Sequence, residues 1–456
     1  MEQRFPRRDE LDQVSAGHPV LLQRGGHNVV ANSRALELIG IEPDVSNPPG
    51  GTFVRDAGGS LTGHAIGAAA QAIRAKLPDP PERVLHDVLL RVERAYNAAG
   101  ITSVIDPGLS PPQIQAHQTL ASAGQPTVRA SLMWRLDPGF DDQALQSALA
   151  ELQSDEIPRD LDDPWARILA IKLGVDGGVE AGYYREPYLF ADDPGSPRGK
   201  PSMAQANLEA FCVEAARLGW QVGAHCLGDA AVDATLSAYE AANQVASIAG
   251  RRWTLIHMMV AREDHWARAN RLGLVITAQQ PLLYTLAEGF LKYIGPDRTR
   301  DLEPLQMYLA RSAQPVGGGS DSPVTPYEPL LGIWSSVTRQ TRGAGGAGPR
   351  VEDHRRGGAA HVHAGQRLRC VRGRPERVDL TRQTRGPGRA GRRPAPGRAR
   401  GNPRYPRAAH ARRGPACVRG LSIETAVVGK ELAMSFVGTT ETDSEQHYHE
   451  KDCFRV

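Results

Sequence analysis

The 456-residue sequence has few of the features that mark secreted and membrane proteins. Its five cysteines show no short regular spacing, so they do not form a disulfide framework, and a reducing cytoplasm is the expected location. A membrane helix needs about 18 consecutive apolar residues, and no apolar run in this sequence approaches that length. The charged N-terminus lacks the apolar stretch of a signal peptide. We therefore expect a cytoplasmic protein with no membrane partner.

Lysine is absent from residues 341–420, although this segment has 21 arginines and only four acidic residues, for a net charge of +17. Residues 421–456 carry −4 and residues 1–340 carry −10, which together give the +3 of the whole chain. Arg, Gly, Pro and Ala dominate residues 343–420 without a sustained apolar period. We expect this segment to be disordered because it cannot bury a core. Residues 421–456 are interpreted as a C-terminal tail.

The basic segment offers an alternative function, because such a charge would bind nucleic-acid phosphates with an affinity that falls steeply as salt rises. Its one aromatic residue is Tyr405, so there is no platform on which bases could stack. No nucleic-acid-binding motif is present either. Nucleic acid is therefore kept as an alternative partner and not as the expected one.

Short apolar runs alternate with helical patterns from about residue 80. Such alternation predicts a parallel sheet, because parallel strands need crossover connections. The expected strands are 102–105, 127–134, 166–175, 220–224, 253–256, 274–277 and 315–319. Eight such units close a (β/α)8 barrel, and seven are visible. We predict an α/β fold with an incomplete TIM-type barrel over residues 76–342 that contains strands two to eight.

Residues 1–75 differ from a barrel unit. A strand is expected over residues 18–23, and a helix capped by Asn32 or Ser33 follows. Residues 50–63 have the pattern of a β-hairpin.

Four predicted strand ends carry side chains suited to a metal: Lys172, His225, His257 and Asp321. Taken singly, each has an ordinary explanation as a solvated lysine, a core histidine or a turn-capping aspartate. Their occurrence at successive barrel exits favours a shared site. Imidazole and carboxylate are good ligands for zinc-type ions, and a lysine carbamylated by carbon dioxide becomes a carboxylate-like bridge. Such a site would activate a water molecule, with an aspartate as general base.

Several stretches resemble the amidohydrolase superfamily, specifically amidohydrolase family 3, which includes N-substituted formamide deformylase-like enzymes. The matching stretches are GHNVVANSRALELIGI, RDAGGSLTG, GITSVIDPG, IKLGVDGG, VGAHCLGDAAVD, LIHMMV and GGGSDSPVTP, spread over about residues 5 to 342. The resemblance implies a distorted TIM barrel that hydrolyses an amide-type C–N bond in a small molecule. It also implies one or two divalent ions, with zinc the first expectation.

The resemblance also implies roles for individual residues. Lys172 matches the carbamylated bridge, and His225 and His257 match ligands of one metal. Asp321 matches the last-strand ligand and general base. His27 and Asn32 fall in the inserted N-terminal subdomain, in a segment that helps to roof the substrate pocket, which makes them candidate substrate-binding residues. Turn and helix-cap structure is the alternative for these two.

The sequence also departs from the family pattern. The β-sandwich segment and the first strand with its His-x-His are absent, and no return to the sandwich is recognisable after Arg342. We hypothesise a truncated reading frame at the front and a frameshift at the back. The histidines at 361 and 363, and at 447 and 449, are not interpreted as replacements. We expect weak activity or a catalytically inactive fragment, and a second copy of the chain could supply the missing strand.

Overall fold

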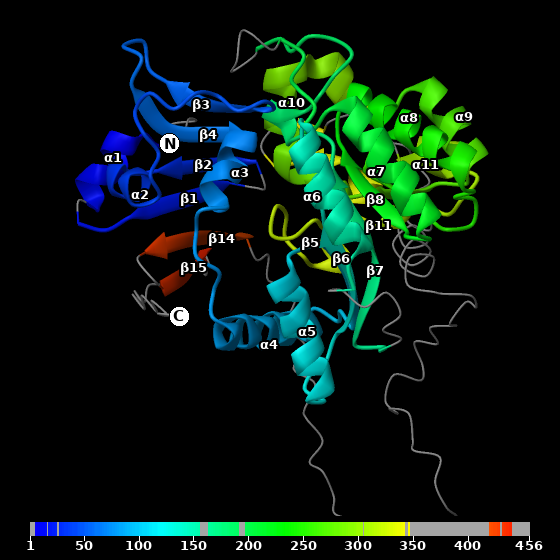
Figure 1. Cartoon of the computed structure of the whole chain (residues 1–456), viewed down its shortest axis with the longest axis horizontal. Coiled ribbons are helices and arrows are strands. Elements are labelled where there is room, and N and C mark those ends of the chain that lie inside the picture. The colour runs from blue at the N-terminus through cyan, green and yellow to red at the C-terminus, as the bar shows by residue number, and fades with distance from the viewer. Residues whose placement is uncertain are drawn as a thin grey trace, which may run out of the picture.

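The computed structural model describes residues 5–15, 17–24, 27–155, 163–190, 197–303, 305–342, 345–346, 419–428 and 431–439. These residues form two main sheets that lie beside each other (Figure 1). One is a parallel sheet with helices on its outer side, and the other is an antiparallel sheet built from the two ends of the described chain. A short ribbon pairs β12 (Gln340–Thr341) with β13 (Gly345–Gly346).

The parallel sheet confirms the seven predicted strands. Its spatial order is β11-β10-β9-β8-β7-β6-β5, so each strand pairs with its neighbours along the chain. The strands are β5 (Ser103–Leu109), β6 (Arg129–Arg135), β7 (Ala166–Gly174), β8 (Val222–Cys226), β9 (Thr254–His257), β10 (Val275–Ala278) and β11 (Gly317–Gly318). Within the described residues no strand joins β5 to β11. The fold is therefore an incomplete TIM-type barrel with two open edges.

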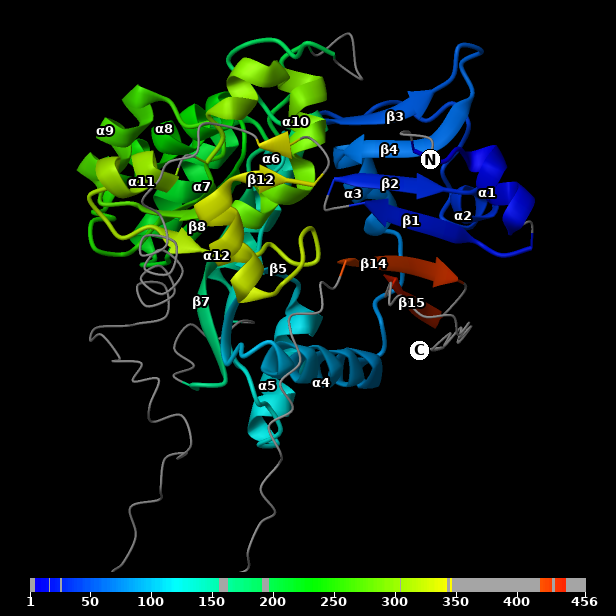
Figure 2. The ribbon, with the colours of Figure 1, turned by 180° about the vertical axis from the view of Figure 1, so that it is seen from behind.

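Helices follow the strands and cover the outer face of this sheet (Figures 1 and 2). They are α4 (Glu82–Ala98), α5 (Pro111–Ser122), α6 (Asp142–Gln153), α7 (Gln205–Arg217), α8 (Asp229–Val245), α9 (Glu263–Leu272), α10 (Gln280–Arg300), α11 (Leu305–Arg311) and α12 (Pro329–Thr338). Two of them, α10 and α12, were not predicted. Helix α10 is kinked at Gly295, whose φ is 82°, directly before Pro296. None of the described helices is long and apolar enough to cross a membrane.

The main core lies between the sheet and its helices. Trp253 is fully buried there; its ring packs edge-on against Tyr239 at 4.7 Å, and its indole N–H donates to the Trp220 carbonyl at 3.0 Å. The opposite, concave face holds a much smaller apolar cluster around Met133, Ala170 and Ile256. The concave face is therefore free to carry polar groups at the carboxyl ends of its strands, where barrel enzymes place their chemistry.

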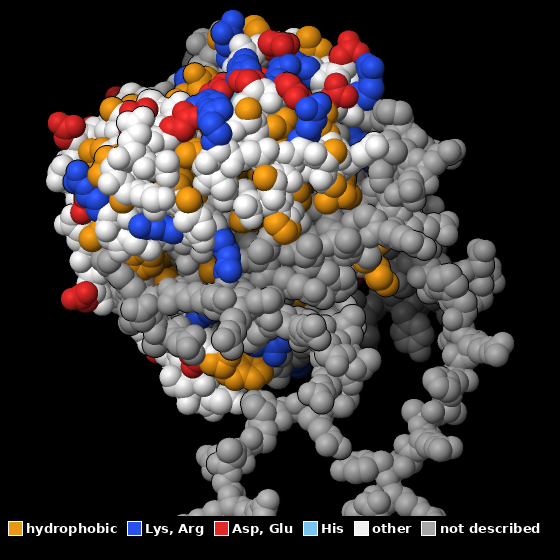
Figure 3. All heavy atoms as spheres, turned by 90° about the vertical axis from the view of Figure 1, so that its right-hand side faces the viewer, with side chains coloured by type: hydrophobic (Ala, Val, Ile, Leu, Met, Phe, Trp, Pro, Cys, Tyr) orange, Lys and Arg blue, Asp and Glu red, His pale blue; other side chains and the backbone are white. Residues whose placement is uncertain are grey.

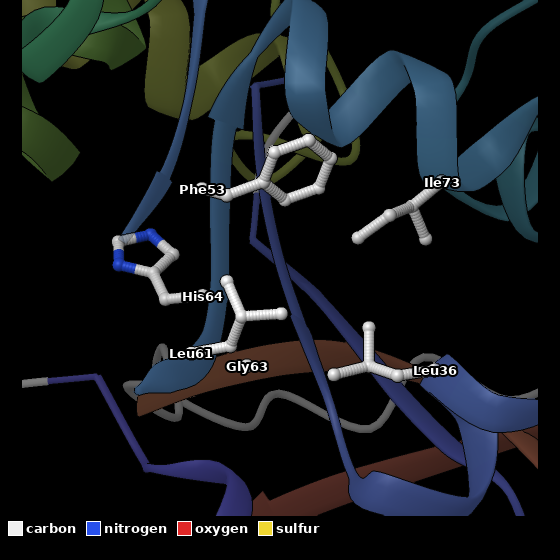
Figure 4. Close-up of a pocket in the computed structure, with 6 residues that line it drawn as sticks. All are labelled: Leu36, Phe53, Leu61, Gly63, His64 and Ile73. Atoms are coloured by element: carbon white, nitrogen blue, oxygen red, sulfur yellow. The ribbon is translucent and has the colours of Figure 1, made fainter. Parts of the chain in front are cut away.

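The antiparallel sheet has the order β15-β14-β1-β2-β4-β3. Its N-terminal strands are β1 (Val20–Arg24), β2 (Asn28–Ala31), β3 (Gly51–Arg55) and β4 (Leu61–Gly67), and helices α1 (Arg8–Val14), α2 (Ser33–Leu38) and α3 (Ala68–Arg74) pack near them. The hairpin predicted over residues 50–63 is β3 and β4, although β4 continues to Gly67. Apolar side chains from α2, α3 and these strands converge on a hollow too small for a water molecule, so it belongs to the core (Figure 4).

The chain does return to this sheet after Arg342, contrary to our expectation. Strands β14 (Arg419–Val428) and β15 (Glu431–Thr439) form an antiparallel hairpin, and β14 pairs with β1. Part of the expected C-terminal tail is thus a pair of strands. Of the segment expected to be disordered, residues 345–346 and 419–420 lie in strands, and the rest lies outside the described residues. The histidines at 361, 363, 447 and 449 also lie outside the described residues.

Candidate metal centre

His225 and His257 lie side by side at the carboxyl ends of two adjacent strands. His225 is on β8, and His257 is the last residue of β9. Their ring centroids are 4.6 Å apart in an edge-on arrangement. Both predicted ligands therefore face the same point above the sheet.

Each of the two imidazoles is held by one of its nitrogens. The Nε2 of His225 lies 3.1 Å from the Gly177 carbonyl, and the Nδ1 of His257 lies 2.7 Å from Oε1 of Gln279. Because both partners are acceptors, these nitrogens carry the protons, and the lone pairs lie on Nδ1 of His225 and Nε2 of His257. Burial and the neighbouring His257 and Lys172 keep the pKa of His225 well below its usual range. A neutral, oriented imidazole of this kind is what a metal requires of a histidine ligand.

Asp176 fixes the loop that carries Gly177, and sequence reasoning did not single it out. Its carboxylate accepts backbone hydrogen bonds from Leu227, Gly228 and Tyr183 at 2.9–3.0 Å. One of its oxygens is also 3.4 Å from Nε2 of His225. The ends of β7 and β8 are thereby joined beneath the histidine. Asp176 does stand within the conspicuous stretch Val-Asp-Gly-Gly, which was the available signal.

Gly228 makes this junction possible. A side-chain Cβ at that position would lie 2.0 Å from the Tyr183 carbonyl oxygen, which is far inside van der Waals contact. Only glycine lets the loop after β7 approach the start of α8 so closely.

Glu303 positions Gln279, the hydrogen-bond partner of His257. It is fully buried, and its Oε1 accepts a hydrogen bond from the Gln279 backbone at 2.9 Å. The other carboxylate oxygen has no hydrogen-bond partner within the described residues. Burial raises the pKa of Glu303 to about 8, so the protonated acid is the form that the fold favours.

The stability of the fold should respond to this carboxyl group. The pKa of Glu303 is higher in the folded protein than its ordinary 4.5, so the folded state binds more protons between the two values and loses stability as pH rises from about 4.5 to 8. We expect Glu303→Gln to remove most of this loss and to be more stable than the parent at pH 8, by a few kcal/mol. Urea unfolding of the parent and of Glu303→Gln at pH 5 and pH 8 measures this difference in the free energy of unfolding.

The matched control for this comparison is Glu263→Gln, because the side chain of Glu263 is 68% exposed on α9. It should leave the pH dependence as it is in the parent. Equal pH slopes for the parent and Glu303→Gln would contradict the argument.

Lys172 and Asp321 complete the predicted set on either side of the histidines. Lys172 is buried on β7, two residues before the residue that pairs with His225. Asp321 follows β11 with a φ of 58°, a conformation that non-glycine residues rarely adopt. Burial raises the pKa of Asp321 to about 6, and the charge of Lys172 opposes the rise. At neutral pH the carboxyl group is therefore mostly ionised and able to accept a proton.

His27 joins this group from the N-terminal sheet. It lies just before β2, and its ring centroid is 5.3 Å from that of His225. The next residue, Asn28, donates a side-chain hydrogen bond to Glu180 in the short helix η1 (Val179–Ala181) of the barrel. This contact joins the two sheets and holds His27 over the site. Burial and the charges of Arg135, Arg74 and Lys172 lower the pKa of His27 to about 3, so the ring is neutral.

Asn32, the other predicted substrate-binding residue, caps helix α2. Its side-chain oxygen accepts from Ala35 and Val20 at 2.9 Å, and its amide donates to the His18 carbonyl at 2.9 Å. The residue is fully buried. The helix-cap alternative accounts for all of these contacts, and the proposals below assign Asn32 no role toward substrate.

A different cluster has the tightest grouping of acidic and histidine ligand atoms. In the parts of the chain that the structure describes, Asp233, Asp264 and His265 alone bring three such atoms within 4.8 Å of one another, so Asp321 does not lie that close to both His225 and His257. The guanidinium of Arg185 contacts both aspartates at 2.6 Å. Charges of both signs also alternate on the barrel surface in Figure 3. An arginine already neutralises this cluster, and we interpret it as an ion-pair network.

The family model for the amidohydrolase family matches residues 1–380. The chain belongs to the amidohydrolase family. Among curated members, it is 28% identical over 358 residues to N-substituted formamide deformylase of Arthrobacter pascens, covering 75% of this chain and 62% of that protein. It is 26% identical over 340 residues to YtcJ of Bacillus subtilis (strain 168), covering 73% and 60%. The chain thus spans about three fifths of the length of these relatives.

Solved structures confirm the fold of this chain. An uncharacterized metal-dependent hydrolase from Pyrococcus furiosus superposes with a TM-score of 0.58 at 22% identity, covering 80% of this chain and 70% of that one. A second, from Pyrococcus horikoshii OT3, gives a TM-score of 0.56 at 22% identity, covering 74% and 63%. The fold of the matched part of this chain is therefore shared with these two solved structures.

Proposed function

We propose that this chain is a metal-dependent hydrolase of amide-type C–N bonds in small molecules. The observation that supports it best is the pair of imidazoles of His225 and His257, whose rings lie 4.6 Å apart and are oriented by hydrogen bonds to the Gly177 carbonyl and Gln279. Two such imidazoles beside a buried lysine and an aspartate fit a divalent ion, with zinc the first expectation. Lys172 would join the set as a carbamate.

Each of these residues would have a separate role in the reaction. A divalent ion held by His225 and His257 would polarise the amide carbonyl and lower the pKa of the attacking water. Asp321 accepts a proton from that water and delivers it to the leaving amine nitrogen. His27, neutral and over the same site, faces the substrate and can hydrogen-bond to its carbonyl. The concave face of the half-barrel holds these groups on rigid strand ends.

Activity should be weaker than in relatives with a complete barrel. The family resemblance implies a His-x-His at the end of a first strand, and the described residues contain neither that strand nor those ligands. We therefore propose that the ion at His225 and His257 is the main one that this chain binds. An inactive fragment is the competing outcome.

Asp321 provides the test of this proposal. With zinc, bicarbonate and a panel of N-substituted formamides, Asp321→Asn should lower kcat by about 100-fold or more, because an amide cannot serve as the general base. The parent rate should fall at acid pH, once Asp321 becomes protonated. Amine release measures turnover, and elemental analysis measures bound metal.

Asp297→Asn is the matched control, since the Asp297 side chain is 90% exposed on α10. It should keep the parent rate. Hydrolysis by Asp321→Asn at the parent rate would refute the assigned base. A parent chain that binds metal but releases no amine would support the inactive fragment instead.

A further inference from the structure

Two arginines approach the candidate site from different sheets. Arg74 lies in the last turn of α3, and Arg135 is the last residue of β6. Helix α3 lies at the end of the N-terminal sheet that faces the barrel (Figures 1 and 2). Sequence reasoning did not single out either residue, because nothing in their local patterns differs from an ordinary solvated arginine.

The contacts of Arg135 place it beside the proposed catalytic groups. It pairs in register with Lys172 on the neighbouring strand. Its Nη2 lies over Gly174, where an added Cβ would be 3.5 Å away, and Gly174 is in register with His225. The guanidinium therefore lies over the strand ends that carry Lys172 and His225.

Burial and the charge of Arg135 lower the pKa of Arg74, and both arginines lower the pKa of the nearby His27. The pKa of Arg74 falls to about 10. Two like charges close enough to interact, one of them partly buried, are unfavourable unless an anion joins them.

Neither guanidinium has an acidic partner in the described parts of the chain, where no hydrogen bond or ion pair from Arg74 or Arg135 is found. Two other partly buried arginines of this barrel are neutralised. Arg185 contacts Asp233 and Asp264, and Arg268 contacts Glu240 at 2.8 Å. The positive charge of Arg74 and Arg135 is therefore concentrated at one side of the site.

We propose that Arg74 and Arg135 bind an oxyanion group of the substrate, a carboxylate or a phosphate-like group, and so select amides that carry a negative charge. Guanidinium groups bind such oxygens through two parallel hydrogen bonds. The proposal rests on the proposed function, since it names the substrate class of the same site. The amide lies toward His225 and His257, and the oxyanion lies toward the arginine pair.

The test is calorimetric binding to the full-length chain after metal removal, which prevents turnover. The probes are N-formylglycine, its uncharged analogue N-formylglycinamide, and N-formylaminomethylphosphonate. Arg74→Gln and Arg135→Gln should each raise the Kd of the charged probes by about tenfold or more, because a charged hydrogen bond is lost, and leave the uncharged probe unchanged. Whichever charged probe binds the parent more tightly identifies the oxyanion.

Further variants separate binding from folding. Arg74→Lys and Arg135→Lys keep the charge and lose the planar fork, so they should show intermediate Kd values. Arg129→Gln is the matched control, because Arg129 begins the same strand β6 and donates to Ser103 at its far end. It should bind all three probes like the parent.

Two results would overturn the inference: charged probes that bind the glutamine variants as tightly as the parent, or an equal loss for the uncharged probe. Metal content and amine release, measured separately on the parent, decide the proposed function. Metal binding and hydrolysis without arginine dependence would refute the oxyanion site alone. Arginine-dependent binding in a chain that takes up no metal would refute the hydrolase and leave the oxyanion site standing.

Discussion

Replacement of His225 by alanine is expected to deprive the chain of its metal. The variant loses one of two imidazoles whose ring centroids lie 4.6 Å apart at the carboxyl ends of β8 and β9. Loss of an outer partner of a metal ligand already costs about 10- to 100-fold in affinity, so loss of the ligand itself should exceed 100-fold. Elemental analysis after purification with bicarbonate should find near-stoichiometric metal in the parent and none in His225→Ala, and Lys172→Ala/His225→Ala should match the single variant.

His18→Ala is the control for this loss, because His18 is exposed at the N-terminal sheet, and the variant should retain the parent's metal. Far-UV circular dichroism establishes that each variant is folded. Equal metal in the parent and in folded His225→Ala would place the ion elsewhere and would contradict the proposed centre.

Replacement of Trp253 by alanine should have the largest effect on stability. Trp253 is fully buried between β9 and α8, against Tyr239, and its N–H satisfies the Trp220 carbonyl. Removal of such a side chain leaves a cavity and costs about 3–5 kcal/mol, a large part of the stability of an ordinary domain. Urea unfolding followed by circular dichroism should show an earlier midpoint, or an unfolded chain at 25 °C.

Trp334→Ala is the matched comparison. Trp334 is 39% exposed on α12, and its ring packs edge-on against Tyr284. We expect a loss below about 1.5 kcal/mol. Similar losses for both tryptophans would mean that the core between the sheet and its helices does not dominate the stability.

The strands of the half-barrel could be predicted because each is a short apolar run between helical patterns. The run at 220–224, directly before His225, is one example, and its boundaries differ from those of β8 by only two residues. Helix α10 was missed because Gly295 and Pro296 interrupt its pattern with a kink. The hairpin of β14 and β15 was missed for another reason: its pairing with β1 depends on a strand at the opposite end of the sequence.

The candidate site shows the same division. Lys172, His225, His257 and Asp321 could be singled out as candidates, because each lies at or near the end of a recognisable strand. The residues that position them could not, since Gln279 and Glu303 act through contacts made only in the folded chain. Likewise, the relation of Arg74 to Arg135 depends on how the two sheets lie against each other.

The pairing of β1 with β14 has a consequence for synthesis. Val20 pairs with Val428, so β1 leaves the ribosome about 400 residues before its neighbour exists. At about 5–20 residues per second this delay lasts roughly 20–80 s. Throughout it, one edge of β1 presents unpaired backbone groups to any passing strand. The nascent protein therefore passes through an interval in which all its parallel strands have emerged but its antiparallel sheet still lacks β14 and β15. Chaperone binding to the open edge of β1 would matter most during this interval.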